Sequence, residues 1–246
     1  MKNRISKATI LFSLLTAVSC TAQTTISVSD QLKSASDSKK TVLLVVSDKA
    51  NSAEKIVALA EAVENERVEV VEMDATAEAN ASLVSEYQLA GAPLPLVLVI
   101  SDRGLTLGGL LEDQITAESI AEVIPTPKFS EISYLMSQGK SVFINVTNDS
   151  FESDKSAKEL CEAASSQLGN SAATISFDAN DKAESKLITM LNIKEKLKDS
   201  YIVVINQQGM MVDRYSKLPT ESELVASAQK VVQTGCAPGG CSTSCQ

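Results

Sequence analysis

The stretch Val97–Gly104, with the sequence VLVISDRG, decides the fold, because it returns as IVVINQQG at Ile202–Gly209. Each copy is an apolar, mostly β-branched run that ends in polar residues and a glycine, which is the pattern of a buried strand followed by a tight turn. The copies lie 105 residues apart (202 − 97). A period of this length is a whole domain per copy, not a solenoid unit of ~20–50 residues.

Further segments on both sides of this stretch recur in the same order. They pair Lys40–Leu43 with Lys140–Phe143, Met73–Ala75 with Phe177–Ala179, and Thr116–Ile120 with Thr220–Leu224. The chain of 246 residues is therefore two copies of one small fold. Pro125 and Pro127 break the chain between the copies and mark the boundary.

Hydrophobic periodicity predicts the same succession of elements in each copy. The predicted strands cover 41–46, 68–73, 96–100 and 105–110, then 142–147, 173–178, 201–206 and 210–215. The predicted helices cover 30–38, 52–64, 78–87 and 115–123, then 129–137, 153–168, 181–191 and 220–232. A strand–helix–strand unit forms a parallel pair and a hairpin adds an antiparallel pair. The fold class is therefore α/β, with two mixed four-stranded sheets that carry helices on both faces.

This order of elements resembles the thioredoxin fold over nearly all of both copies. The most specific segment is Tyr87–Val97, YQLAGAPLPLV, since thioredoxin-like proteins carry a glycine and a cis-proline just before the corresponding strand. Counting from Gly91 selects Pro93 as the cis-proline, and counting back from the turn glycine selects Pro95. The second copy departs from the family pattern, because its matching segment, residues 196–201, contains no proline.

The resemblance implies the fold but not dithiol chemistry. Thioredoxins place Cys-x-x-Cys between the first strand and the following helix, where the helix N-terminus acidifies the thiol. The corresponding segments, Ser47–Ser52 and Thr147–Ser153, contain no cysteine. The chain also has no histidine, which excludes histidine-based catalysis and histidine-ligated metals. Cys161 lies on an apolar helix face, which predicts a buried thiol. We therefore do not expect an enzyme of the thioredoxin type.

The N-terminus is typical of a bacterial export signal. Three basic residues precede the apolar run Ala8–Val18, which is shorter than the ~20 residues of a membrane span. The segment Ala17–Cys20 resembles the cleavage site of bacterial lipoproteins, although alanine stands where leucine is usual. On this resemblance Cys20 becomes the mature N-terminus and carries palmitate-type acyl chains. Ordinary cleavage after Ser19 or Ala22 is the alternative, and it leaves Cys20 as a free thiol.

The C-terminal tail carries three cysteines within ten residues, Cys236, Cys241 and Cys245. Their spacing does not match the Cys-x2-Cys pairs of structural zinc sites. Three uses remain open: binding of a soft metal such as Cu(I), Zn(II) or Hg(II), disulfide formation or exchange with another protein, and a passive cross-link. The domains themselves require no cofactor.

The chain thus divides into a signal peptide (1–19), a tether (20–29), a first domain (30–124), a linker (125–128), a second domain (129–233) and a cysteine-rich tail (234–246). The formal net charge is −9, and it becomes −12 once Lys2, Arg4 and Lys7 are removed, because 19 basic residues then face 31 acidic ones. Such a chain is repelled by phosphate backbones, so we expect no nucleic-acid partner.

These observations predict an exported protein of the bacterial cell envelope, periplasmic or on the outer surface, that touches the membrane only through its lipid. Its two non-catalytic domains are expected to bind an envelope protein or to assist assembly, with the tail as an accessory thiol site. The alternative is a thiol–disulfide exchange or soft-metal-binding protein that works through the tail.

Overall fold

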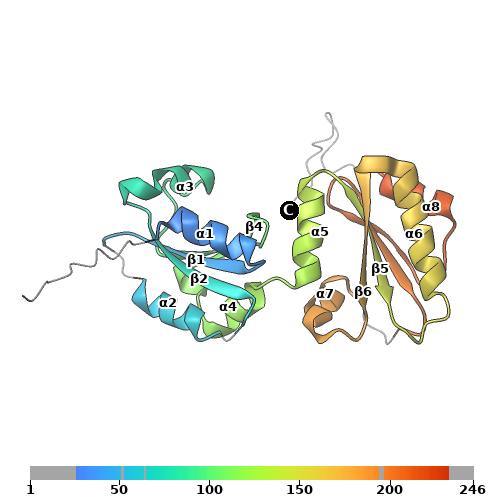
Figure 1. Cartoon of the computed structure of the whole chain (residues 1–246), viewed down its shortest axis with the longest axis horizontal. Helices are drawn as coiled ribbons and strands as arrows, with labels where there is room; N and C mark the ends of the chain where they lie inside the picture. The colour runs from blue at the N-terminus through green and yellow to red at the C-terminus, as the bar shows by residue number, and fades with distance from the viewer. Residues whose placement is uncertain (1–25, 51–52, 64, 194–196, 233–246) are drawn as a thin grey trace, which may run out of the picture.

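The computed structural model describes residues 26–50, 53–63, 65–193 and 197–232. These residues form two mixed α/β domains, joined by a short connection between α4 (Ala117–Val123) and α5 (Pro127–Ser137) (Figure 1). None of the described helices is long and apolar enough to cross a membrane. The repeat in the sequence is therefore a repeat of the structure.

The sheet of domain 1 has the strand order β2-β1-β3-β4. The strands are β1 (Thr41–Ser47), β2 (Val68–Asp74), β3 (Leu96–Ile100) and β4 (Thr106–Leu111). β1 pairs in parallel with β2 and antiparallel with β3, and β3 pairs antiparallel with β4. This is the predicted parallel pair extended by a hairpin.

Domain 2 repeats this arrangement in the order β6-β5-β7-β8. Its strands are β5 (Ser141–Thr147), β6 (Ala172–Asp178), β7 (Tyr201–Ile205) and β8 (Met211–Tyr215). The pairings have the same directions as in domain 1. Both domains thus have the thioredoxin-like fold that the sequence predicted.

Helices cover both faces of each sheet. In domain 1, α1 (Val28–Asp37) and α3 (Ala81–Glu86) pack on one face, and α2 (Glu54–Glu61) and α4 on the other. In domain 2, α5 and α7 (Ser185–Met190) pack on one face, and α6 (Asp154–Leu168) and α8 (Glu221–Ala228) on the other. Short 3-10 turns, η1 (Glu78–Asn80), η2 (Glu112–Gln114), η3 (Gly169–Ser171) and η4 (Lys182–Glu184), lie between these elements.

The central strands carry most of each core. All seven residues of β1 are buried, because alternate side chains enter the clusters on opposite faces. Six of the seven residues of β5 are buried in the same way. Full burial of one leucine- or phenylalanine-sized side chain contributes roughly 1.5–3 kcal/mol. This explains why strands buried on both faces read as unbroken apolar runs.

Several helix ends differ from the prediction by a few residues, and the structure explains two of these differences. α5 begins at Pro127 rather than at residue 129, since Thr126 accepts a hydrogen bond from the Phe129 N–H and proline suits the first helical position. The linker predicted at 125–128 therefore loses its last two residues to α5. α8 ends at Ala228 rather than at residue 232, because side chains take over the backbone groups that follow. Asn206 donates to the carbonyl of Lys230, and Gln208 bonds both backbone groups of Val232.

The two domains touch through α5 and α7. The guanidinium of Arg103, in the turn before β4, lies 4.6 Å from the ring centroid of Tyr134 in α5. The ammonium of Lys186 in α7 donates to the carbonyls of Glu122 and Ile124 at the end of α4. Burial lowers the pKa of Lys186, although the nearby Glu122 acts in the opposite direction.

Candidate functional site

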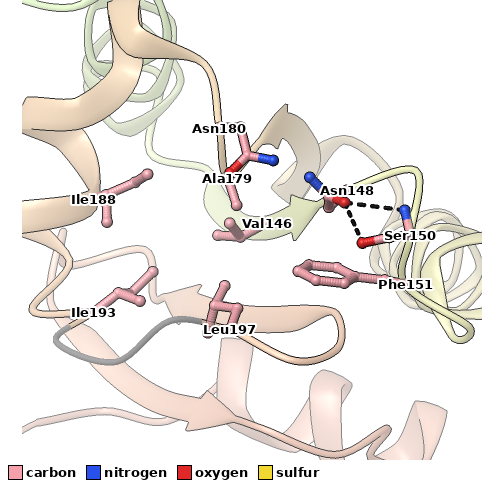
Figure 2. Close-up of a pocket in the computed structure, with 9 residues that line it drawn as sticks. All are labelled: Val146, Asn148, Ser150, Phe151, Ala179, Asn180, Ile188, Ile193 and Leu197. Carbon is pink, nitrogen blue, oxygen red and sulfur yellow. Dashed lines mark hydrogen bonds between the residues drawn. The ribbon is translucent and has the colours of Figure 1, made fainter.

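A pocket of about 250 Å³ opens at the carboxyl end of β5 in domain 2. In Figure 2 the ring of Phe151 points toward Val146 and Leu197, and Ile188 and Ile193 lie beyond them, across the pocket from Phe151. Asn148, Ser150, Ala179 and Asn180 complete the lining. The site thus combines an apolar floor with a few amide and hydroxyl groups, which is the usual composition of a binding pocket.

The loop that carries Phe151 follows β5, and it corresponds to the segment that holds the dithiol in thioredoxins. Its first turn is closed locally: Asn148 Oδ1 accepts hydrogen bonds from the N–H and the hydroxyl of Ser150. The N–H of Phe151 donates to the carbonyl of Asn148 at 2.9 Å. These bonds fix the direction in which the phenyl ring leaves the backbone.

Two aspartates from neighbouring loops hold this loop in place. Asp178, at the end of β6, accepts from Asn148 Nδ2 at 3.2 Å. Asp199, just before β7, accepts from the hydroxyl of Ser153 at 2.6 Å and from its N–H at 3.1 Å. The hydrogen bond from the Ser153 hydroxyl is the main cause of a lowered pKa of Asp199, helped by the N–H groups of Ser200 and Ser153. The pocket wall is therefore pre-organised by hydrogen bonds to two aspartate side chains.

Asp74 and Asp178 end the second strand of their domains and act as turn residues. Asp74 Oδ1 accepts from the N–H and the hydroxyl of Thr76, both at 2.7 Å, and the hydroxyl is the main cause of the lowered pKa of Asp74. Asp178 Oδ1 likewise accepts from the N–H of Asn180 at 2.7 Å. Both carboxylates stabilise local turns, as short polar side chains commonly do.

Polar and apolar side chains both line the pocket. The nine described residues that line it include amides and a hydroxyl, and none of these nine is an acid, a base or a thiol. The hydroxyl of Ser150 donates to Asn148 Oδ1. The segments that carry the dithiol in thioredoxins hold no cysteine in either domain.

The cis-proline of domain 1 is Pro95 and not Pro93, because the cis peptide bond joins Leu94 to Pro95. Since Leu96 and Tyr201 begin equivalent strands, Asp199 and Ser200 take the places of Leu94 and Pro95 in domain 2. Domain 2 thus has a loop-binding carboxylate where domain 1 has the residue before its cis-proline.

Cys161 is fully buried in α6, as its helical spacing predicted. Burial raises the pKa of its thiol to about 12, with a smaller contribution from Glu162. A thiol with this pKa is almost entirely protonated at neutral pH and is a poor nucleophile.

The remaining predicted site residues, Cys20, Cys236, Cys241 and Cys245, lie outside the described residues, as do the signal peptide and most of the tether. Within the described parts of the chain, no three side chains of Cys, Asp or Glu come together in a way that could hold a metal ion. Metal binding by the tail therefore stays a prediction.

The residues that line the pocket, and Asp199 behind it, were not identified as site residues from the sequence. Leu197 lies in an irregular segment without periodicity, and Asp199 contacts a loop 46 residues earlier in the chain. Two signals existed. Phe151 lies in the segment that corresponds to the dithiol segment of thioredoxins, and the second copy lacks the proline that the first copy carries near Asp199.

Comparisons with known proteins found similar structures but no family. No family model and no curated protein matches the chain. The chain is similar to the first two thioredoxin domains of Saccharomyces cerevisiae Eps1p, at 10% identity over 83% of this chain and 96% of that chain, with a TM-score of 0.33.

Two other similar structures are human ERp44 in its zinc-bound form and the NTD_N/C domain of the alkylhydroperoxide reductase AhpF of Enterococcus faecalis. ERp44 has 12% identity over 81% of this chain and 57% of that chain, with a TM-score of 0.36. The AhpF domain has 11% identity over 81% of this chain and 98% of that chain, with a TM-score of 0.27. The fold itself is assigned from strand order and strand direction.

Proposed function

We propose that this is an exported, lipid-anchored protein of the bacterial cell envelope whose two thioredoxin-like domains bind a protein partner without redox chemistry. The pocket of domain 2 carries the proposal. It lies at the loop where thioredoxins keep their dithiol, yet its lining combines polar groups with the apolar side chains of Phe151, Leu197 and Val146, which face one another. Thiol exchange is replaced there by a surface that suits an apolar side chain of an extended protein segment.

The structure of this loop favours binding over catalysis. Asp178 and Asp199 hold it from two sides, so the pocket does not have to form when the partner arrives. Pre-organisation of this kind reduces the entropy cost of association. An apolar anchor in a pocket with a polar edge is also the arrangement in which single residues contribute most to protein–protein affinity.

A pair of matched variants tests this function. Leu197→Asp places a charge in the pocket, whereas Leu218→Asp places one on a leucine that is 45% exposed outside it. A partner captured from envelope extracts should bind the wild-type chain and Leu218→Asp, and binding should fall at least tenfold with Leu197→Asp. Equal capture by both variants, at matched thermal stability, would exclude the pocket as the binding site.

The lipid anchor is tested separately by intact mass. The protein purified from bacterial membranes should begin at Cys20 and carry acyl chains, and Cys20→Ser should release it from the membrane fraction. A mature mass without acyl groups would leave the binding proposal standing and remove the anchor.

A second candidate function rests on the tail. Three clustered thiols in an exported chain remain available for exchange or for a soft metal, while the thiol of Cys161 is buried and protonated. The triple change Cys236→Ser, Cys241→Ser and Cys245→Ser should then abolish disulfide exchange or Cu(I) binding. Unchanged activity in this variant would eliminate the second candidate.

A further inference from the structure

A polar groove runs between helix α6 and strand β6, on the face of the domain 2 sheet opposite to α5 and α7. Its volume is about 530 Å³. It is lined by Lys158, Glu162, Ser165 and Ser166 of α6 and by Thr174 and Ser176 of β6. β6 is the outer strand of this sheet, so the groove lies along an open edge.

The backbone of β6 offers unused hydrogen-bonding groups beside this groove. The N–H of Ala179 donates to the carbonyl of Thr147, and the carbonyl of Phe177 accepts from the Thr147 hydroxyl, so Phe177 faces β5. Backbone groups face alternate sides along a parallel strand. Thr174 and Ser176 therefore direct their own N–H and C=O groups to the open edge.

The equivalent edge of domain 1 is protected, whereas this edge is not. β2 carries Glu69 and Glu72, and Glu69 pairs with Lys40 at 3.5 Å. Charged side chains of this kind are a common means of preventing strand addition at an edge. β6 has no charged residue before Asp178, its last position. An uncharged strand beside a side-chain groove is the geometry in which an extended segment adds to a sheet.

The chain itself has a segment with matching chemistry. The 14 residues after Val232 include no charged side chain, and Gly239–Gln246 reads GGCSTSCQ. Its hydroxyl and amide groups suit a groove lined by serines and a threonine. An uncharged strand also meets no like charge at Lys158 or Glu162.

The position of Val232, where the described chain ends, allows the tail to reach this groove. Val232 is bonded through its N–H and its C=O to Gln208, at 2.7 and 3.2 Å, in the turn after β7. Because β7 is antiparallel to β5, this turn lies at the end of the sheet where β5 and β6 begin. A position outside β6 is about three strand spacings away, roughly 14 Å. Fourteen extended residues span up to about 46–50 Å.

We propose that the C-terminal tail docks on domain 2 as an additional strand, parallel to β6, with alternate side chains in the groove between α6 and β6. The parallel direction follows from the end of the sheet at which the tail starts. This site is separate from the pocket at Phe151, so it does not depend on the proposed partner binding. It would hold the tail thiols along one edge of domain 2.

A cysteine scan tests the docking directly. Ser176→Cys is combined with a single tail cysteine that is moved stepwise through positions 241 to 245, with the other tail cysteines and Cys20 changed to serine. Mild oxidation should give an intramolecular disulfide at every second tail position, because side chains of a strand alternate. The matched control is Glu72→Cys, the equivalent position on the edge of domain 1, which should cross-link at least tenfold less.

Other outcomes contradict the proposal. Uniform cross-linking along the tail, or equal cross-linking with Glu72→Cys, would mean that the tail only collides with the edge. Disulfides between two chains would mean that the groove takes the tail of a second copy, and would overturn docking within one chain.

Hydrogen exchange supplies a test without new cysteines. The N–H groups of Thr174 and Ser176 face the open edge, so they are protected only if something docks there. In a chain that ends at Thr234 they should exchange at least tenfold faster than in the full chain under reducing conditions. Equal rates in the two chains would overturn the proposal.

Discussion

Val45 of domain 1 and Asn145 of domain 2 occupy equivalent places in the central strands of two sheets with the same topology. Both side chains are fully buried. Val45 packs in the cluster formed with α2 and α4, whereas neither amide atom of Asn145 has a hydrogen-bond partner among the described residues. The same fold therefore accommodates a buried polar side chain in domain 2 at a position where domain 1 has an apolar one.

At two further pairs of equivalent positions, domain 2 again has a polar side chain with different surroundings from its counterpart in domain 1. Asn80 of domain 1 donates to the carbonyl of Asp74 within its own turn. Glu184 of domain 2, which is 1% exposed, instead accepts from the N–H of Lys128 at the start of α5 at 2.9 Å. Leu94 and cis-Pro95 of domain 1 are replaced by Asp199 and Ser200. At these positions domain 2 has polar side chains that bond to distant segments, Glu184 to α5 and Asp199 to the loop after β5.

The largest expected effect is the loss of stability when a core side chain is removed from one domain only. Phe143→Ala removes a fully buried ring from domain 2 and should destabilise that domain by about 3–5 kcal/mol, because a cavity remains where the ring was. Leu43→Ala makes the matched change in domain 1. Hydrogen exchange resolved by peptide should show each loss confined to its own domain. Equal loss in both domains would show that they unfold as one cooperative unit.

A second pair of variants concerns the edge strand β4. A Cβ on Gly109 would lie 2.9 Å from the carbonyl oxygen of Val97, whereas a Cβ on Gly108 would meet nothing within 4 Å. Gly109→Ala should therefore destabilise domain 1 by about 1–3 kcal/mol, as other substitutions that overfill a packed site do. Gly108→Ala should leave the stability nearly unchanged. Denaturant midpoints measure both, and a similar loss in the two variants would refute the steric explanation. Domain 2 has Asp213 in place of Gly108 and Arg214 in place of Gly109.

Asn145→Val transfers the residue of domain 1 into domain 2. It should stabilise domain 2 by about 1–2 kcal/mol, because it removes two buried polar atoms that lack partners. The reverse change, Val45→Asn, should destabilise domain 1. Chemical unfolding measures both effects. A loss of stability in Asn145→Val would reveal a hydrogen-bond partner of this amide beyond the protein's own described groups.

The smallest expected effect is the pH dependence contributed by Asp199. Its pKa in the folded protein is below the ordinary value, chiefly because of the Ser153 hydroxyl. Its stabilisation is therefore present above the unfolded pKa of about 3.9 and is lost as the pH falls through the folded pKa. Wild type should exceed Asp199→Ala in stability at pH 7, and the difference should shrink toward pH 2. Leu94→Ala, the equivalent change in domain 1, should show a difference that does not vary with pH.

The strands could be predicted because each central strand is an unbroken apolar run, and such runs are buried on both faces. The order of elements followed from local patterns, and the parallel and antiparallel pairings followed from that order. Asn145 was not recognised as a buried polar residue, since one asparagine within an apolar run does not show where its amide points. Its exceptional position becomes visible only when Val45 is placed beside it.

The pocket was beyond prediction for a different reason. Phe151, Leu197 and Asp199 come from loops that are brought together only by the sheet, and no sequence period links them. The helix ends differed for a related reason. Side chains from a distant turn, Asn206 and Gln208, bond the backbone after Ala228, and helical propensity contains no information about such partners.

The bonds that Gln208 makes to both backbone groups of Val232 also set a limit to enzymatic trimming. A protease needs an extended, unbonded stretch of backbone, and residues 230 to 232 are tied down by side chains of the turn after β7. A carboxypeptidase that has removed the tail should therefore stop near Val232 and leave α8 intact. Damage to the cysteine-rich tail would then remain local, and domain 2 would survive it as a folded unit.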